Sequence, residues 1–193
     1  MRFLAGLPED LRFVLALHEG AAIGMAAGHA IARGAPSLAL LHSTAGLGNA
    51  VAALATARLN RAPLVVVVGQ QDRRHLALDP FLAGHLHGLA GEYAVWVDQP
   101  VRAQDVPGAI ARAYHEAATG LGPAIVIVPI DDWTAPGPEP HEILGPQTLL
   151  RSTGAGPEAV DALADLLAAA DAPAIVAGAG ADGAERWVAL VAL

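Results

Sequence analysis

The chain has 193 residues, a formal net charge of −8, 54% hydrophobic residues and no cysteine. The acidic balance, without a basic stripe, excludes a nucleic-acid-binding surface, and the missing cysteines exclude disulfides and thiolate chemistry. No apolar run is long enough to cross a membrane, and the beginning lacks the layout of a signal peptide. We therefore expect a soluble, cytoplasmic protein with no nucleic-acid or membrane partner.

Six short apolar runs predict strands, and helical patterns alternate with them. The predicted strands are residues 13–17, 38–42, 64–69, 94–97, 124–128 and 174–177. The predicted helices are residues 20–33, 46–60, 104–120 and 157–170. Strands that alternate with helices of this length are typical of βαβ units. The fold class predicted is therefore α/β, a doubly wound, mostly parallel sheet with helices on both faces.

A stretch rich in proline and glycine interrupts this alternation at residues 134–156. It has no apolar period, which is typical of a linker. We predict a first domain at residues 1–135, a linker at 136–156 and the start of a second α/β domain at 157–193. The last segment is too short for another domain of this kind, so we expect it to be incomplete.

Glu19 lies where the first predicted strand turns into a helix. In open α/β sheets, ligands bind at this carboxyl edge of the strands. A carboxylate flanked by apolar positions must be hydrogen-bonded or have a shifted pKa. The alternative is an ordinary acid at a helix N-terminus, favoured by the helix dipole.

The sequence LLHSTAGLGNA follows the second predicted strand and repeats this placement. His42 ends the apolar run, Gly46 and Gly48 let a backbone approach closely, and Asn49 comes next. His42 and Glu19 could therefore line one crevice. The alternatives are a histidine bonded to nearby backbone and glycines that only make a tight turn.

Two adjacent amides, Gln70 and Gln71, end the third predicted strand, and Phe81 and Leu82 follow in an apolar-tipped loop. The amides could bind a polar ligand, and the loop could form a substrate wall or a subunit contact. The alternative is an ordinary polar loop.

Two other motifs carry weaker signals. His85 and His87 have no further ligand at a spacing that suits a metal, so we predict no metal site there. Residues 178–183 fit the dinucleotide pattern G-x-G-x-x-G, but the acidic residue expected about 20 positions later is not in this sequence. We therefore interpret these glycines as serving packing and not as a nucleotide site.

The order of four segments is more specific than any single motif. LALHEGAAIGMAAGHA, LLHSTAGLGNAVAALATA, PLVVVVGQQDR and PAIVIVPIDDW together resemble the thiamine-diphosphate-dependent 2-keto acid decarboxylases, in particular their benzoylformate decarboxylase branch. The likeness runs from about residue 3 to 133, the pyrimidine-binding domain, and more loosely through 157–193, the start of the central domain. It implies the thiamine-diphosphate-binding fold.

The resemblance also assigns roles to individual residues. Glu19 matches the glutamate that hydrogen-bonds the cofactor's pyrimidine ring and favours its imino tautomer, which makes the nucleophilic ylid. His42 matches the histidine that handles protons during the reaction. The cofactor-binding set implied is Glu19, Gly46, Gly48 and Asn49, and the substrate-pocket set is His42, Gln70, Gln71, Phe81 and Leu82.

The sequence also departs from this family. Its relatives begin earlier, with a helix, a strand and a serine-bearing turn, and they end with a domain that holds magnesium and the diphosphate. We therefore expect the N-terminal fragment of a homo-oligomeric enzyme, with half a cofactor site and no activity on its own. The empty sheet position should cause aggregation or subunit pairing.

The activity that the resemblance implies for the parent enzyme is non-oxidative decarboxylation of a benzoylformate-like 2-keto acid, with thiamine diphosphate and magnesium as cofactors. One alternative is a carboligase of the acetolactate synthase type. Another is a non-catalytic, truncated remnant that acts by subunit association.

Overall fold

The computed structural model describes residues 7–139, 154–181 and 183–193. The chain divides into two compact units, Met1–Gln147 and Thr148–Leu193, which we describe separately. Most of the predicted linker, and Asp182 of the G-x-G-x-x-G match, lie outside the described residues. In the described part of the chain, we find no helix long and apolar enough to cross a membrane.

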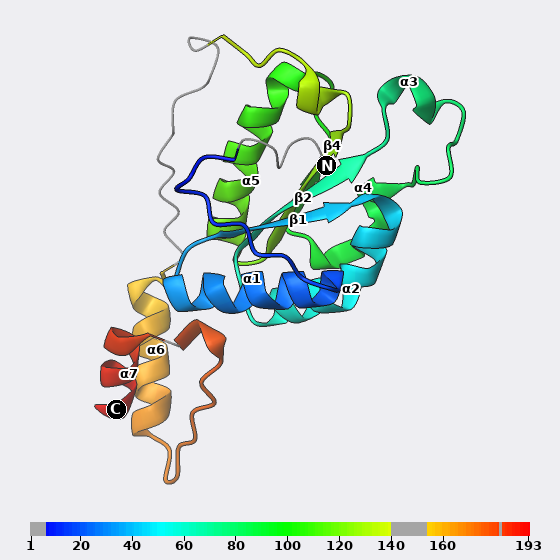
Figure 1. The fold of residues 1–193 in the computed structure, drawn as a ribbon. Helices are drawn as coiled ribbons and strands as arrows, with labels where there is room; N and C mark the ends of the chain where they lie inside the picture. Colours follow the sequence, from blue (N-terminus) through cyan, green and yellow to red (C-terminus); the bar gives the residue numbers. More distant parts are fainter. Residues whose placement is uncertain (1–6, 140–153, 182) are drawn as a thin grey trace. The chain divides into compact units, whose positions relative to one another are not determined.

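The first unit is built on a four-stranded sheet in the order β1-β2-β4-β3, with all neighbours parallel (Figure 1). The strands are β1 (Ser37–His42), β2 (Leu64–Gln70), β3 (Trp96–Asp98) and β4 (Pro123–Pro129). Four predicted strands are thus confirmed, although β3 begins two residues later than expected. The predicted α/β class with a parallel sheet is confirmed.

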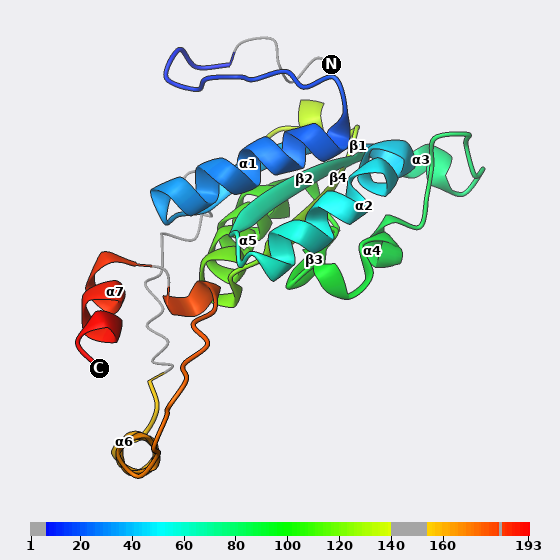
Figure 2. The same ribbon diagram turned by 90° about the horizontal axis from the view of Figure 1, so that it is seen from below.

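Helices cover both faces of this sheet, as predicted. Helices α1 (Glu19–Arg33) and α2 (Ser43–Leu59) run side by side on one face, and α5 (Val106–Gly120) covers the other (Figures 1 and 2). Alternate residues of β2 serve the two cores: Val66 packs with the α1–α2 side and Val65 with the α5 side. This two-sided burial is why the central strands read as unbroken apolar runs.

Short elements fill the connections of the first unit. They are α3 (Arg73–Leu76), α4 (Leu86–Leu89), η2 (Gly91–Tyr93), η3 (Ala103–Asp105) and η4 (Asp132–Thr134). Helix α2 begins three residues earlier than predicted, because Ser43 adopts a positive φ of 53° and turns the chain directly out of β1. The N-terminus of α2 therefore lies immediately beside His42.

The predicted strand at residues 13–17 is wrong. This segment forms no regular structure, and Leu15 and Leu17 are 77% and 102% exposed. A strand is stable only when a neighbour pairs with its backbone, and among the described residues β1 pairs with β2 alone. An apolar run reveals the propensity of a strand but not the presence of that neighbour.

The second unit contains α6 (Pro157–Ala168), η5 (Ala179–Ala181) and α7 (Ala184–Val191). The strand predicted at residues 174–177 is also wrong, for the same reason: the segment is irregular and Val176 is 97% exposed. No described residue of this unit is buried. Its described part is therefore helical and has no core of its own.

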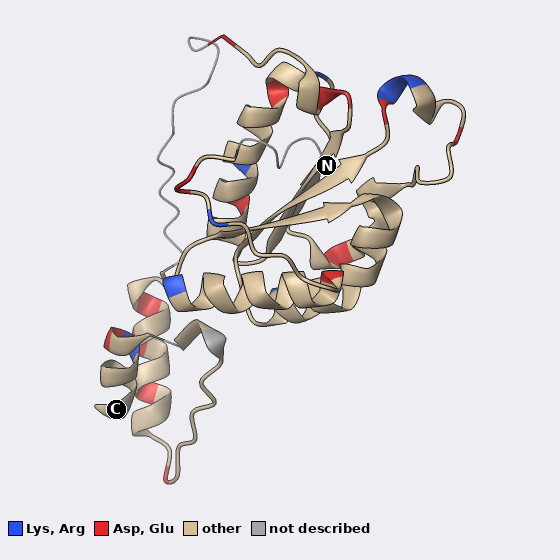
Figure 3. Cartoon of the chain, viewed as in Figure 1, with Lys and Arg blue, Asp and Glu red and all other residues tan. Residues whose placement is uncertain are grey.

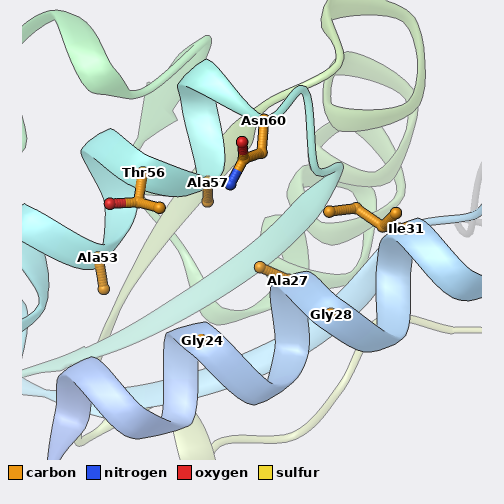
Figure 4. A pocket seen from close by; sticks show the side chains of 8 residues that line it. All are labelled: Gly24, Ala27, Gly28, Ile31, Ala53, Thr56, Ala57 and Asn60. Atoms are coloured by element: carbon orange, nitrogen blue, oxygen red, sulfur yellow. The ribbon is translucent and has the colours of Figure 1, made fainter. Parts of the chain in front are cut away.

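A groove of about 320 Å³ lies between α1 and α2 (Figure 4). Small side chains dominate its lining: Gly24, Ala27, Gly28, Ile31, Ala53, Thr56, Ala57 and Asn60. They come from α1, from the second half of α2 and from Asn60 just after it, so the lining does not include the helix N-termini at the carboxyl edge of the sheet.

Candidate functional site

The predicted site residues gather where β1 and β2 end and α1 and α2 begin. His42 ends β1, Gln70 ends β2, and Glu19 is the first residue of α1. All of these ends lie at one edge because the strands are parallel. This common edge is the candidate site.

Glu19 contacts another of the predicted residues. Its Oε2 accepts a hydrogen bond from Nδ2 of Asn49 on α2, at 3.2 Å. The backbone N–H of Glu19 lowers the pKa of this carboxyl below its ordinary value, and the Asn49 amide lowers it further. Glu19 is therefore ionised at neutral pH and offers a fixed negative charge at the edge of the sheet.

The surroundings of Glu19 are more polar than the sequence suggests. Glu19 is only half-buried, and Leu17, just before it, is completely exposed. The apolar neighbours therefore point into solvent and do not cover the carboxylate. His18 instead caps α1, because its Nδ1 accepts a hydrogen bond from the backbone N–H of Gly20 at 3.0 Å.

His42 is exposed at the end of β1 and lies against Gly69 of β2, its partner in the ladder. A Cβ on Gly69 would fall 2.7 Å from Nδ1 of His42, closer than any ordinary contact. The absence of a side chain at position 69 therefore makes room for the imidazole.

The two glycines at the start of α2 differ in burial and in the space around them. Gly46 is buried, and a Cβ there would make an ordinary contact with Cβ of Leu41 at 3.5 Å, so α2 packs against β1 at this position. Gly48 is exposed, and a Cβ added at this position would have no atom within 4 Å. Of the two, only Gly48 has open space beside the exposed Asn49.

The two amides at the end of β2 also differ in burial. Gln70 is 4% exposed, and both ends of its amide are bonded within the chain. Gln71 is half-buried. In the loop that follows α3, Phe81 is 98% and Leu82 42% exposed.

Arg73, which our sequence analysis did not select, connects two loops at this edge. Its backbone N–H donates to Oδ1 of Asp131 at 3.2 Å, and its guanidinium binds Asp132 and the carbonyl of Pro100. Figure 3 shows the basic residues of α3 and the acidic residues after β4. The signal in the sequence was a pair of acids directly after a strand, next to the strand that ends in the two glutamines.

The described residues contain no group of three or more histidine, cysteine, aspartate or glutamate side chains that could hold a metal ion. His85 and His87 are both exposed, at the N-terminus and within the single turn of α4.

Comparison with known proteins identifies the first unit. Residues 1–93 match the family model described as "Thiamine pyrophosphate enzyme, N-terminal TPP binding domain". Benzoylformate decarboxylase from Pseudomonas aeruginosa is 37% identical over 184 residues, 94% of this chain and 35% of that protein. An acetolactate synthase large subunit from Lactococcus lactis is 30% identical over 177 residues, 89% of this chain and 30% of that protein.

A solved structure shows the same similarity. A thiamine diphosphate-dependent 4-hydroxybenzoylformate decarboxylase from Rhodococcus jostii aligns with a TM-score of 0.85 and 35% identity. The alignment covers 93% of this chain and 34% of that one. The chain thus spans about a third of the length of these relatives. Through residues 1–93, it belongs to the thiamine pyrophosphate enzymes and carries their N-terminal cofactor-binding domain, with benzoylformate decarboxylases among its relatives.

Proposed function

We propose that this chain is the N-terminal part of an enzyme that decarboxylates a 2-keto acid non-oxidatively, with a benzoylformate-like substrate. The observation that carries the proposal is the Glu19 carboxylate, which Asn49 holds at the first turn of α1. The similarity to decarboxylases named for benzoylformate and 4-hydroxybenzoylformate supports the choice of substrate class.

The residues at the edge fit the pyrimidine half of thiamine diphosphate. An ionised carboxylate such as Glu19 can accept a hydrogen bond from a ring nitrogen and stabilise the protonated form of that nitrogen. The open space at Gly48 lets a flat ring approach the backbone of α2. When bound, the cofactor supplies a carbon nucleophile and a ring that accepts electrons.

His42 is the candidate proton carrier. Its imidazole is exposed at the end of β1, so a substrate at this edge can reach it. Histidine ionises near neutral pH, which suits it to donate and accept protons in turn. In this proposal His42 donates to or accepts from the substrate oxygen, while Glu19 holds its charge near the pyrimidine.

The remainder of the site belongs to other parts of the enzyme in this proposal. We place the magnesium ion and the diphosphate on a domain outside this chain, contributed by a second subunit. The chain alone would then be inactive, and the enzyme would be a cytoplasmic homo-oligomer.

A carboligase of the acetolactate synthase type is the second candidate. The observation that favours it is the 30% identity to an acetolactate synthase large subunit over 89% of this chain. Under that alternative, pyruvate would replace the aromatic 2-keto acid. A non-catalytic role in subunit association is a third reading of a chain that spans about a third of its relatives.

A chimera tests these candidates directly. This chain would replace the matched segment of the Pseudomonas aeruginosa benzoylformate decarboxylase, which supplies the other domains. We expect decarboxylation of benzoylformate that depends on thiamine diphosphate, with little acetolactate formed from pyruvate. Glu19→Gln in the chimera should lower kcat by roughly 10²–10⁴-fold, because a neutral amide cannot stabilise the protonated ring nitrogen.

The control is Glu92→Gln, a carboxylate on η2 outside the set of candidate site residues. It should leave kcat unchanged. Acetolactate formation from pyruvate at a higher rate than benzoylformate turnover would favour the carboligase. A folded chimera without either activity would support the non-catalytic reading.

A further inference from the structure

Gln70 uses its side chain entirely within the protein. It is 4% exposed; its Oε1 accepts the backbone N–H of Gln71 at 2.9 Å, and its Nε2 donates to the carbonyl of Gly84 at 3.0 Å. A buried amide bonded at both ends cannot bind a substrate without breaking these bonds, which leaves a buried group unsatisfied. Gln70 is therefore better placed to hold the loop that contains Gly84.

Gly84 is the second-last residue of the loop of residues 77–85, which connects α3 to α4. It also packs against Thr44 so closely that a Cβ at position 84 would lie 1.7 Å from the Thr44 Oγ1. Thr44 comes two residues after His42, and Gln70 comes one residue after Gly69, on which His42 lies. Gly84 is thus attached to both chain segments that surround the imidazole.

Helix α3, which precedes this loop, is held separately. Asp72 is 7% exposed and caps α3 by accepting the backbone N–H of Arg74 at 2.9 Å. Arg73 binds Asp131 and Asp132 beyond β4. The helix that precedes the loop and the residue Gly84 near its end are therefore both held at the edge of the sheet.

The middle of the loop differs from its ends. Its large apolar side chains are exposed, 79% for Leu78 and 98% for Phe81, and Asp79 adopts a positive φ of 47°. Among the described residues, the backbone hydrogen bonds of this part are short-range turns, such as Ala83 N–H to the Pro80 carbonyl. The position of Phe81 and Leu82 therefore depends on the anchors at the two ends.

We propose that Gln70 is a positioning residue, which through its hydrogen bond to Gly84 fixes the loop that carries Phe81 and Leu82 to the edge of the sheet where His42 lies. This inference rests on the proposed function for its meaning, since there the loop supplies the apolar wall of the substrate pocket and His42 the proton carrier. It changes the role of Gln70 from substrate contact to loop anchor. Gln71, which is half-buried, is the amide left to face a ligand.

The test compares Gln70→Ala, Gln70→Glu and the control Gln71→Ala in the full chain, without cofactor or substrate. Hydrogen–deuterium exchange in residues 77–85 should become about two- to tenfold faster in both Gln70 variants, the change that corresponds to one neutral hydrogen bond. Amides of β2 and β4 should keep their protection. The ring signals of His42 in NMR spectra should shift in the Gln70 variants and stay in place in Gln71→Ala.

The Gln70→Glu variant also allows a rescue of the loop anchor by low pH. A buried glutamate takes up a proton more readily than a free one, because burial raises its pKa, and the protonated carboxyl can again donate to Gly84. Protection of the loop should therefore return in this variant as the pH is lowered, relative to the wild type at the same pH. Gln70→Ala, which has no donor, should not recover.

Wild-type exchange in the loop of Gln70→Ala would overturn the proposal. So would faster exchange that is equal throughout the unit, because that reports lower global stability alone, or His42 signals that do not move. If Gln70→Ala does not fold, Gly84→Ala disturbs the same anchor from the other side through its overlap with Thr44. These measurements need no activity, so their failure is distinct from the failure of the chimera assay.

Discussion

The two units of this chain place similar apolar sequences in opposite surroundings. In the first unit, Val66 and Ile125 at the centre of the sheet are completely buried. In the second, Leu163 of α6 is 56% and Trp187 of α7 61% exposed. The helices of both units are rich in apolar residues, but among the described residues only those of the first unit have a sheet to pack against.

The difference shows what buries an apolar pattern. A helix of 8 to 15 residues gains most of its stability from tertiary packing, because its own hydrogen bonds barely offset the entropy of ordering it. The first unit supplies that packing through β2 and β4, which are covered on both faces. The described part of the second unit has no strand, and its helices remain exposed.

A core truncation in each unit should give the largest contrast. Ile125→Ala removes a completely buried side chain from β4, and it should lower the free energy of unfolding by about 2–5 kcal/mol. Leu163→Ala on α6 should change it by less than about 0.5 kcal/mol, because the side chain is already exposed. Urea unfolding followed by circular dichroism measures both. Equal losses would show that the second unit has a core.

A glycine substitution in each unit should give a smaller contrast. Gly69→Ala pushes a methyl group into His42, and such overpacking costs about 1–3 kcal/mol. Gly178→Ala meets nothing within 4 Å and should be neutral. Thermal unfolding gives the stability change, and the His42 ring signals report the displacement. Unshifted His42 signals in Gly69→Ala would mean that the added methyl group does not displace the imidazole.

The pH dependence should give the smallest effect. The Arg74 side chain, together with its backbone N–H, holds the pKa of Asp72 well below its ordinary value of 3.8. A lowered pKa in the folded state contributes stability above the unfolded pKa, and this contribution fades as the pH falls below about 3.8. Asp72→Asn should therefore flatten the fall in urea midpoint in that range.

Arg74→Ala is the matched control for the pH experiment, since it removes the guanidinium and keeps the carboxylate. It should flatten the profile in the same direction but less, because the backbone N–H of residue 74 still donates to Asp72. A profile as steep as that of the wild type in both variants would show that other carboxylates determine the acid limit.

The sequence predicts the central strands well, for a physical reason. Strands β2 and β4 are buried on both faces, so their residues are apolar except at the end of β2, and the run is visible without any knowledge of its neighbours. Residues 13–17 have the same apolar appearance and form no strand. What they lack is a partner for their backbone, and local sequence does not encode that.

The candidate site could likewise be predicted only in part: the sequence indicates its residues but not the contacts between them. Glu19 and His42 could be selected because each comes where an apolar run gives way to a predicted helix, and Asn49 was selected through the family resemblance. The bond between Glu19 and Asn49 joins residues 30 positions apart, and that between Arg73 and Asp132 joins residues 59 positions apart. Such contacts depend on how helices and loops pack, so no local pattern predicts them.

The pairing of β2 with β4 has a consequence for how the protein is made. Leu64 pairs with Pro123, and β3 and α5 lie between these strands in the sequence. During synthesis, β2 leaves the ribosome well before β4, with Val65 and Val67 still without the partners that bury them. Contacts between distant segments close slowly, and exposed strands meanwhile attract other chains. We therefore expect the nascent first unit to depend on chaperone binding until the segment containing β4 has been translated.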